Sequence, residues 1–122
     1  MSCVFCHLSE ENWLAHSAYF YAVWNIDPIQ EGHLLVISKK HRMAIAELSN
    51  EEKLDLIDFQ NQLIEKMEKS STILGVTLII NNGKLMDAGT HFHSHLIPRY
   101  EDDGFWNEVS PKKRAFPKNQ LQ

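Results

Sequence analysis

The sequence has little of several features that define large classes of proteins. Among its 122 residues there are two cysteines and five glycines. No apolar run approaches the ~20 residues that span a bilayer, and the N-terminus lacks a basic region followed by an apolar core. The formal net charge of −4 does not suit nucleic acid, which usually meets a basic face. We therefore expect a soluble cytoplasmic protein with neither a membrane nor a nucleic-acid partner.

The composition that remains is ordinary for a small globular protein. Hydrophobic residues make up 43% and charged residues 23% of the chain, and the length suits one domain with a modest core. There is no internal repeat and no glycine-rich loop of the kind that cradles phosphates. We expect one domain over residues 1–110 and a tail over 111–122, with Phe105 and Trp106 packing the irregular stretch that follows Arg99.

Segments rich in β-branched and aromatic residues predict a sheet. The expected strands are residues 19–24, 33–38, 75–81 and 91–99. One long helix is expected between the second and the third strand, over residues 50–70. Strands in runs around a single helix indicate an α+β fold with an antiparallel meander sheet rather than a wound α/β sheet.

The helix prediction rests on a start signal and on apolar periodicity. Ser49 followed by Glu52 forms a capping box. Apolar residues then recur at spacings of three and four, which predicts one buried face widened by its neighbours. The residues of this face are Leu56, Phe59, Leu63 and Met67, with Leu54, Ile57 and Ile64 beside them. The basic cluster before the helix, made of Lys39, Lys40 and Arg42, is interpreted as solvated charge.

Histidines at alternate positions are the main chemical signal. In a strand, His91, His93 and His95 lie on one face, roughly 6.5 Å from one to the next. Pro98 argues against a helix in this stretch and fits a strand end or a sheet edge. Three interpretations stay open: solvated or core histidines, a metal site, and phosphate chemistry with one imidazole as the nucleophile.

The cysteines stand together as Cys3-Val-Phe-Cys6. A structural disulfide is not expected in a reducing cytoplasm, and a redox pair of this spacing normally follows a strand in a βαβ unit. Two thiolates at this spacing suit one tetrahedral zinc ion. The pair therefore indicates half of a zinc site, which needs two further ligands from elsewhere in the chain.

These residues together resemble the histidine triad (HIT) family. The motif is His91-x-His93-x-His95 followed by Leu-Ile-Pro-Arg. Upstream, the blocks 25–28, 32–37 and 39–41 match that family in order and spacing, and the cysteine pair matches one part of it. The resemblance covers residues 3–106.

The resemblance implies a nucleotide hydrolase or transferase that acts on the α-phosphate of a purine nucleotide derivative, and a homodimer whose two sheets join. By position, His93 would be the nucleophile that forms a nucleotidyl-histidine intermediate. His95 would hydrogen-bond the phosphate or the leaving oxygen, and His33 would orient the triad. Asn25 would contact the ribose hydroxyls, and Asn81 would bind phosphate.

The resemblance also completes the metal site and narrows the substrate. His41 and His91 would join Cys3 and Cys6 as a structural zinc site, with no organic cofactor. The segment 98–105 resembles bacterial dinucleoside polyphosphate hydrolases, which favours a substrate such as diadenosine tetraphosphate. A nucleoside phosphoramidase, a nucleotide-binding module with little catalysis and a metal-handling protein are the alternatives.

The chain departs from the family pattern just before the triad. Residues 86–90 replace the usual glycine-glutamine stretch, and the loop is one residue short. The glutamine that contacts phosphate in relatives is therefore missing. Asp87 would place a carboxylate near bound phosphates, and Ser94 replaces an apolar residue on the opposite face, where we expect an effect on packing only.

Overall fold

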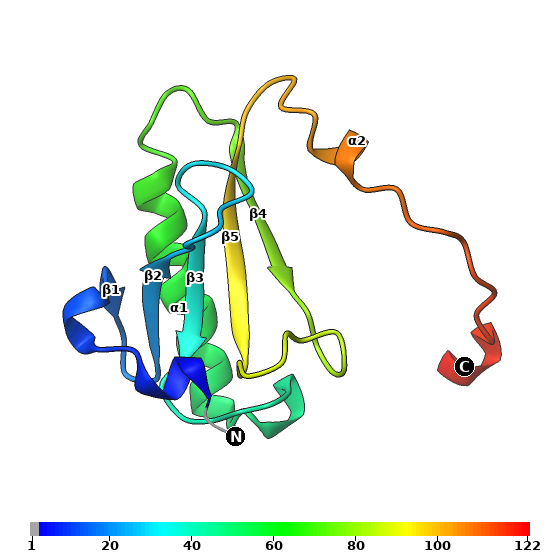
Figure 1. Cartoon of the computed structure of the whole chain (residues 1–122), viewed down its shortest axis with the longest axis horizontal. Coiled ribbons are helices and arrows are strands. Elements are labelled where there is room, and N and C mark those ends of the chain that lie inside the picture. Colours follow the sequence, from blue (N-terminus) through cyan, green and yellow to red (C-terminus); the bar gives the residue numbers. More distant parts are fainter. Residues whose placement is uncertain (1–2) are drawn as a thin grey trace.

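The structure is a computed structural model and describes residues 3–122. Its centre is a five-stranded antiparallel sheet with the strand order β1-β2-β3-β5-β4 (Figure 1). The strands are β1 (Ala15–His16), β2 (Phe20–Trp24), β3 (Leu34–Ser38), β4 (Gly75–Ile80) and β5 (His93–Arg99). The antiparallel α+β prediction is confirmed, and the four predicted strands are present with ends shifted by up to two residues. The two-residue strand β1 was not predicted.

The last strand in the sequence lies inside the sheet. β5 pairs with β3 on one side and with β4 on the other, so the chain returns past β4 instead of adding strands in simple order. The β3 pairing ends at Leu34–Leu96, and beyond that point β5 pairs with β4 alone. Pro98 lies in this one-sided stretch, where its missing N–H costs no bond to β3.

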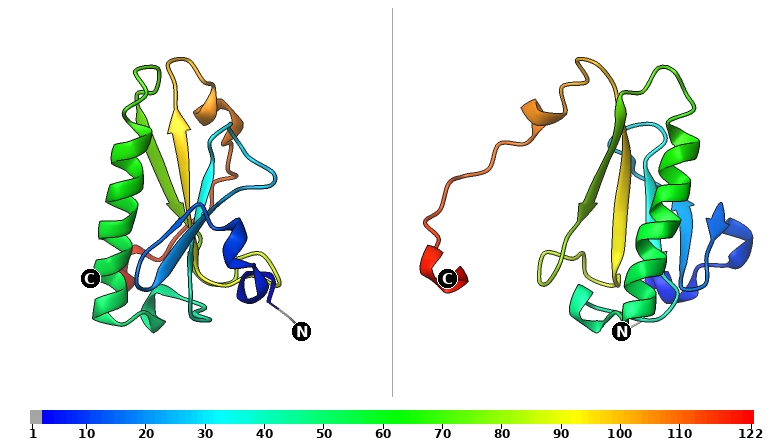
Figure 2. Two further views of the ribbon diagram at one scale, coloured as in Figure 1. Left: turned by 90° about the vertical axis from the view of Figure 1, so that its left-hand side faces the viewer. Right: turned by 180° about the vertical axis from the view of Figure 1, so that it is seen from behind.

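The long helix α1 (Asn50–Met67) covers one face of the sheet (Figure 2). The predicted capping box of Ser49 and Glu52 is present, and the side chains of Leu56, Phe59 and Leu63 are buried against the sheet. The prediction that Leu54 and Ile57 widen the buried face is wrong, because their side chains are 66% and 62% exposed. The part of the helix surface that packs on the sheet is therefore narrower than the apolar face predicted from the sequence.

The opposite face is partly covered by the N-terminal segment. Of two short 3-10 helices in this segment, Val4–His7 lies on this side of the sheet and Glu10–Asn12 lies beside β1 at its edge (Figure 2). Phe5, Leu8 and Trp13 pack there against Tyr21, Val23 and Ile37 in a second, smaller core. The uncovered part of this face carries the histidines.

The loop after β3 corrects a second prediction. Lys40 is exposed, as expected for solvated charge. Arg42 is not part of a solvated cluster, because its guanidinium forms an ion pair of 3.0 Å with the buried Glu52. Lys39 donates a 2.6 Å hydrogen bond to the carbonyl of Ser17 and lies over the Trp13 ring. A third 3-10 helix, Ile45–Glu47, then leads into α1.

Beyond β5 the chain makes a turn and leaves the sheet. Arg99 binds Asp103 at 2.7 Å and stacks on Phe105, which begins the short helix α2 (Phe105–Glu108). The chain then runs away from the sheet as far as a 3-10 helix at Lys118–Leu121 (Figure 1). Phe105 is half-buried, but Trp106 is 67% exposed and does not pack this stretch as predicted. The domain boundary at residue 110 stays a prediction. Over residues 3–122, no helix combines the length and the apolar character needed to cross a bilayer.

Candidate active site and metal centre

The histidine row lies on the face of the sheet opposite α1. Strand β5 presents His93 and His95 on this face, where they stand across from Ile37 and Leu35 of β3. His33 comes just before β3 and is 2% exposed. His91 precedes β5, and the carbonyl of its neighbour Phe92 still accepts a hydrogen bond from the Ser38 N–H. The row therefore continues through His91, although the regular strand begins two residues later than predicted.

The surroundings of His93 fix which of its nitrogens is free. Its Nδ1 lies 2.8 Å from the carbonyl oxygen of His91. A carbonyl can only accept, so Nδ1 carries the proton and donates it. In the neutral ring, Nε2 then holds a lone pair and is available as a nucleophile. Phe5 packs edge-on against this ring, with the centroids 5.0 Å apart.

A relay of hydrogen bonds fixes the tautomer of His95 in the same way. The backbone N–H of Ile29 donates to Nδ1 of His33 at 3.1 Å, so neutral His33 carries its proton on Nε2. That N–H faces Nδ1 of His95 at 2.9 Å. Nδ1 of His95 is thus an acceptor, and its Nε2–H is left to donate to a bound ligand. The hydrogen bond from the Ile29 N–H to His33 therefore also fixes the tautomer of His95.

Burial keeps both relay histidines neutral. Burial, assisted by His93 and His33, lowers the pKa of His95 to about 4, against a smaller opposing effect from Asp87. Burial also lowers the pKa of His33. Neutral imidazoles are what the relay requires, because a doubly protonated ring has no acceptor nitrogen.

The two predicted asparagines lie at the margins of the row. The Asn25 side-chain oxygen accepts the N–H of Asp27 at 2.8 Å. Its amide nitrogen lies 3.3 Å from Nε2 of His33 but forms no hydrogen bond with it in the relay, because both groups are then donors. Asn81 follows the last residue of β4. Because Ile80 stands across from Ser94, one further step of the same register places Asn81 across from His93. Asn81 is half-buried, and its side chain forms no hydrogen bond within residues 3–122.

An apolar cavity bounded by Phe5, whose ring packs on His93, was missed by sequence reasoning. It has a volume of about 430 Å³ and an apolar lining drawn from the N-terminal segment, β2 and β3. Its lining includes Val4, Phe5, Leu8, Val23, Ile26 and Leu35. Val23 and Leu35 point to the histidine face by strand alternation, which was a usable signal. The contribution of Phe5 depends on how the N-terminal segment folds back, and no local pattern shows this.

The four predicted metal ligands come together at one end of the row. The Sγ atoms of Cys3 and Cys6 and the ring nitrogens of His41 and His91 all lie within 4.8 Å of one another. Nδ1 of His91 is 3.1 Å from Sγ of Cys3, and Nδ1 of His41 is 3.2 Å from Sγ of Cys6. Sulfur and nitrogen ligands of a tetrahedral zinc are about 3.5 Å apart, given Zn–S near 2.3 Å and Zn–N near 2.0 Å.

The protonation states also suit a metal. The Nε2–H of His91 donates to the carbonyl of Ser38 at 2.7 Å, so Nδ1 presents its lone pair to the thiols. Partial desolvation and the adjacent Cys3 raise the pKa of the Cys6 thiol, although the residue as a whole is exposed. A bound divalent cation would lower the pKa of the thiols again and stabilise them as thiolates. The donor set and its spacing therefore fit a Cys2His2 zinc site.

The family is decided by comparison over most of the chain. Residues 8–102 match the HIT domain. The chain belongs to the HIT family. An uncharacterised HIT-like protein of Methanocaldococcus jannaschii is 32% identical over 107 residues, which are 84% of this chain and 82% of the relative. Adenosine 5'-monophosphoramidase hnt1 of Schizosaccharomyces pombe is 32% identical over 108 residues, 84% of this chain and 78% of the relative.

A solved structure shows the same fold. Plasmodium falciparum diadenosine triphosphate hydrolase superposes with a TM-score of 0.72 at 25% identity, covering 79% of this chain and 66% of that protein. The family prediction made from the triad and its upstream blocks is thus confirmed.

The departure from the HIT pattern before the triad has a defined structure. In the loop between β4 and β5, the N–H of Thr90 donates to the carbonyl of Asp87, and the carbonyl of Gly89 accepts the N–H of Val4 at 2.7 Å. The loop is thus tied to the N-terminal segment that carries Cys3. The carboxylate of Asp87 is exposed and acts to raise the pKa of His95, so it lies within electrostatic reach of the HIT triad.

The other departure, Ser94, lies on the helix side of β5. Its side chain is 0% exposed, and its hydroxyl has no hydrogen-bond partner within residues 3–122. The effect is therefore more than a change of packing, because a buried hydroxyl without a partner lowers stability.

Proposed function

We propose that this chain is a nucleotide hydrolase that forms a covalent intermediate on His93. The orientation of His93 carries the proposal, since its Nδ1–H is held by the His91 carbonyl and its Nε2 is free to attack. Nε2 forms a bond to the α-phosphorus while the bond from phosphorus to the leaving oxygen or nitrogen breaks. Water then cleaves the phosphorus–nitrogen bond and releases the nucleoside monophosphate with free His93. Covalent capture splits one difficult displacement into two easier ones.

The neighbouring residues take roles that agree with their hydrogen bonds. The Nε2–H of His95 is the group left to donate, so it would hold a phosphate oxygen or give its proton to the leaving group. His33 would act by keeping His95 in that tautomer. Asn25 would contact the ribose and Asn81 the phosphate. The apolar cavity bounded by Phe5 would take the purine nucleoside.

Cys3, Cys6, His41 and His91 would hold a structural zinc ion. When bound, zinc would supply charge and a fixed tetrahedral geometry at the end of the row, with no open position for substrate. His91 is two residues from His93 and its carbonyl accepts the Nδ1–H of His93. A ligated His91 would therefore hold the backbone that orients the nucleophile.

Two leaving groups are candidates. The segment after the triad favours a dinucleoside polyphosphate such as diadenosine tetraphosphate, and one structural relative is a diadenosine triphosphate hydrolase. A nucleoside phosphoramidate is favoured by the S. pombe relative, which is named a monophosphoramidase, and by Asp87, whose negative charge would repel a polyphosphate leaving group.

The enzyme would act as a homodimer in the cytoplasm. β4 is a six-residue strand at the edge of the sheet, and Leu78 on it is 44% exposed. A long edge strand with exposed apolar residues is a template for pairing with a second chain. Sedimentation at micromolar concentration would give the mass of two chains, and a monomer would contradict this part of the proposal.

A turnover panel tests the function. Diadenosine tetraphosphate, diadenosine triphosphate and an adenosine phosphoramidate are incubated with the wild type and with His93→Ala, and AMP release is followed by chromatography. We expect AMP from the wild type alone, with the fastest substrate identifying the leaving group. Equal turnover in His93→Ala would contradict the mechanism, and AMP binding without turnover of any substrate would favour a binding module.

A further inference from the structure

The proposed zinc ligands come from three separate stretches of chain, which carry Cys3 and Cys6, His41, and His91. The stretch that carries His41 is held in place by contacts of its own. His41 lies in the loop of residues 38–42, between β3 and the approach to α1. This loop contacts the segment that carries His91 through backbone bonds. The N–H of Phe92 donates to the carbonyl of Arg42 at 2.6 Å, and the carbonyl of Ser38 accepts Nε2–H of His91 at 2.7 Å. Each of these bonds lies next to a metal ligand.

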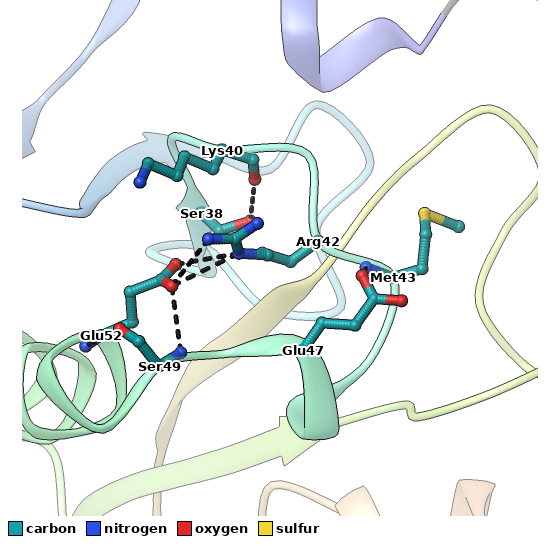
Figure 3. Close-up of polar contacts among 7 residues, drawn as sticks. All are labelled: Ser38, Lys40, Arg42, Met43, Glu47, Ser49 and Glu52. Atoms are coloured by element: carbon teal, nitrogen blue, oxygen red, sulfur yellow. Dashed lines mark hydrogen bonds and ion pairs between the residues drawn. The ribbon is translucent and has the colours of Figure 1, made fainter.

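The far end of this loop is anchored by an ion pair between the partly exposed Arg42 and the buried Glu52 (Figure 3). The Arg42 guanidinium donates to Glu52 through Nη2 at 3.0 Å and through Nε at 3.3 Å to each carboxylate oxygen. Glu52 is 1% exposed and lies in the first turn of α1. Burial acts to raise the pKa of Glu52, but hydrogen bonds from Arg42 and Ser49 outweigh it and lower the pKa, so the carboxylate is charged.

We propose that the Arg42–Glu52 pair is a positioning element for the metal centre. It fixes the loop that carries His41 against the segment that carries His91, and so couples zinc affinity to the N-terminus of α1. The proposal rests on the zinc site proposed above. Groups that orient a ligand without touching the metal commonly contribute about 10–100-fold to its affinity. Arg42 acts on the metal centre through its backbone. Its side chain is bound to Glu52, which keeps the Arg42 carbonyl in position to accept the Phe92 N–H.

Glu52 has a second role that must be separated from the first. Its carboxylate also accepts the Ser49 N–H at 3.0 Å, while the Ser49 hydroxyl accepts the Glu52 N–H at 3.1 Å. Loss of this capping box would weaken the start of the helix without changing the contact between Arg42 and Glu52. Ser49→Ala removes half of the box and is therefore the matched control for helix stability.

The experiment compares metal binding in four proteins: the wild type, Arg42→Lys, Glu52→Gln and Ser49→Ala. Lysine keeps the charge of Arg42 but cannot make the two-pronged contact, and glutamine keeps an acceptor for the Ser49 N–H. Zinc affinity is measured by competition with a chromophoric chelator. Cobalt(II) substitution reports the coordination geometry through its visible d–d bands. Urea unfolding shows that each variant is folded under the binding conditions.

We expect zinc affinity to fall about 10-fold or more in Arg42→Lys and Glu52→Gln, with weaker or shifted cobalt bands, and to stay within about 2-fold of wild type in Ser49→Ala. Unchanged affinity and spectra in both pair variants would overturn the proposal. An equal loss in Ser49→Ala would also overturn it, since helix capping would then explain the effect. If the wild type bound no zinc, the zinc site itself would be wrong, while turnover through His93 would be tested separately by the substrate panel.

Discussion

On one face of β5 the histidine side chains have hydrogen-bond partners, whereas Ser94 on the other face has none within residues 3–122. His93 donates to a carbonyl, and His95 accepts from His33. On the helix side, the hydroxyl of Ser94 and the side-chain oxygen of Gln60 are buried without a partner within residues 3–122. The cost of burying a polar group is thus offset for His93 and His95 and is not offset for Ser94. The predictions below test this difference.

After loss of the nucleophile, the largest effect is expected from removing His95, the proton donor whose tautomer is fixed by His33. His95→Ala should lower kcat/KM by on the order of 10²–10⁴, because proton donation to the leaving group is lost. The measurement is steady-state turnover of the preferred substrate. A nucleotide ester with a strongly acidic leaving group, which needs no proton, should lose much less. His16→Ala, an exposed histidine outside the row, is the control. Equal losses on both substrates would contradict the donor role.

Removal of the metal should lower stability rather than act on chemistry directly. A chelator should reduce the free energy of unfolding by about 3 kcal/mol when zinc was present at 100 or more times its Kd. Urea unfolding with and without the chelator measures this. Cys6 is exposed, so Cys6→Ser should behave like chelated wild type and should not respond to the chelator. A chelator effect that persists in Cys6→Ser would place the metal elsewhere.

The low pKa of His95 predicts a loss of stability in acid. The pKa of His95 is about 4 in the folded chain, against an ordinary value of 6.5. At a pH between these two values, His95 therefore binds a proton in the unfolded chain but not in the folded chain. Stability should therefore fall as the pH drops from 6.5 to 4, by about 1–2 kcal/mol after allowance for solvent screening. Urea unfolding across this range should give a shallower slope for His95→Gln, and an unchanged slope would contradict the prediction.

The smallest effect is expected on the helix side of the sheet. Ser94→Ala should raise the free energy of unfolding by about 1 kcal/mol, because it removes a buried hydroxyl without a partner. Ser38 is the matched control: it is also 0% exposed, but its hydroxyl donates to the Lys40 carbonyl at 2.8 Å. Ser38→Ala should lower stability by about 1 kcal/mol. Denaturant unfolding of the two variants should thus give opposite signs, and equal signs would remove the proposed difference.

Features with a local signature were predictable from the sequence. The strands around His33 and His91, the capped helix and the association of distant blocks with one family all follow from periodicity and motif. The roles of the site residues stay predictions, although the structure brings the ligand set together. Proximity of the four ligands could be expected only because the family supplied it.

Features that depend on how elements dock were not predictable. The exposure of Leu54 and Ile57 depends on which arc of α1 meets the sheet. Arg42 looked solvated because its partner Glu52 is ten residues away on another element, and the two meet only after the loop folds back. β1 is two residues long, too short to show any alternation. The apolar cavity needs Phe5 to lie over His93, which is a tertiary arrangement.

The two-residue repeat of β5 has a consequence for how this motif can change over time. Positions 92, 94 and 96 face the core and can be exchanged one at a time while the imidazoles keep their places. A single inserted or deleted residue between positions 91 and 95 would instead turn part of the row toward α1. It would separate His91, the proposed ligand, from the other three members of its group, or bury the ring of His93, the proposed nucleophile. The motif should therefore tolerate substitutions between the histidines far better than a change in the number of residues between them.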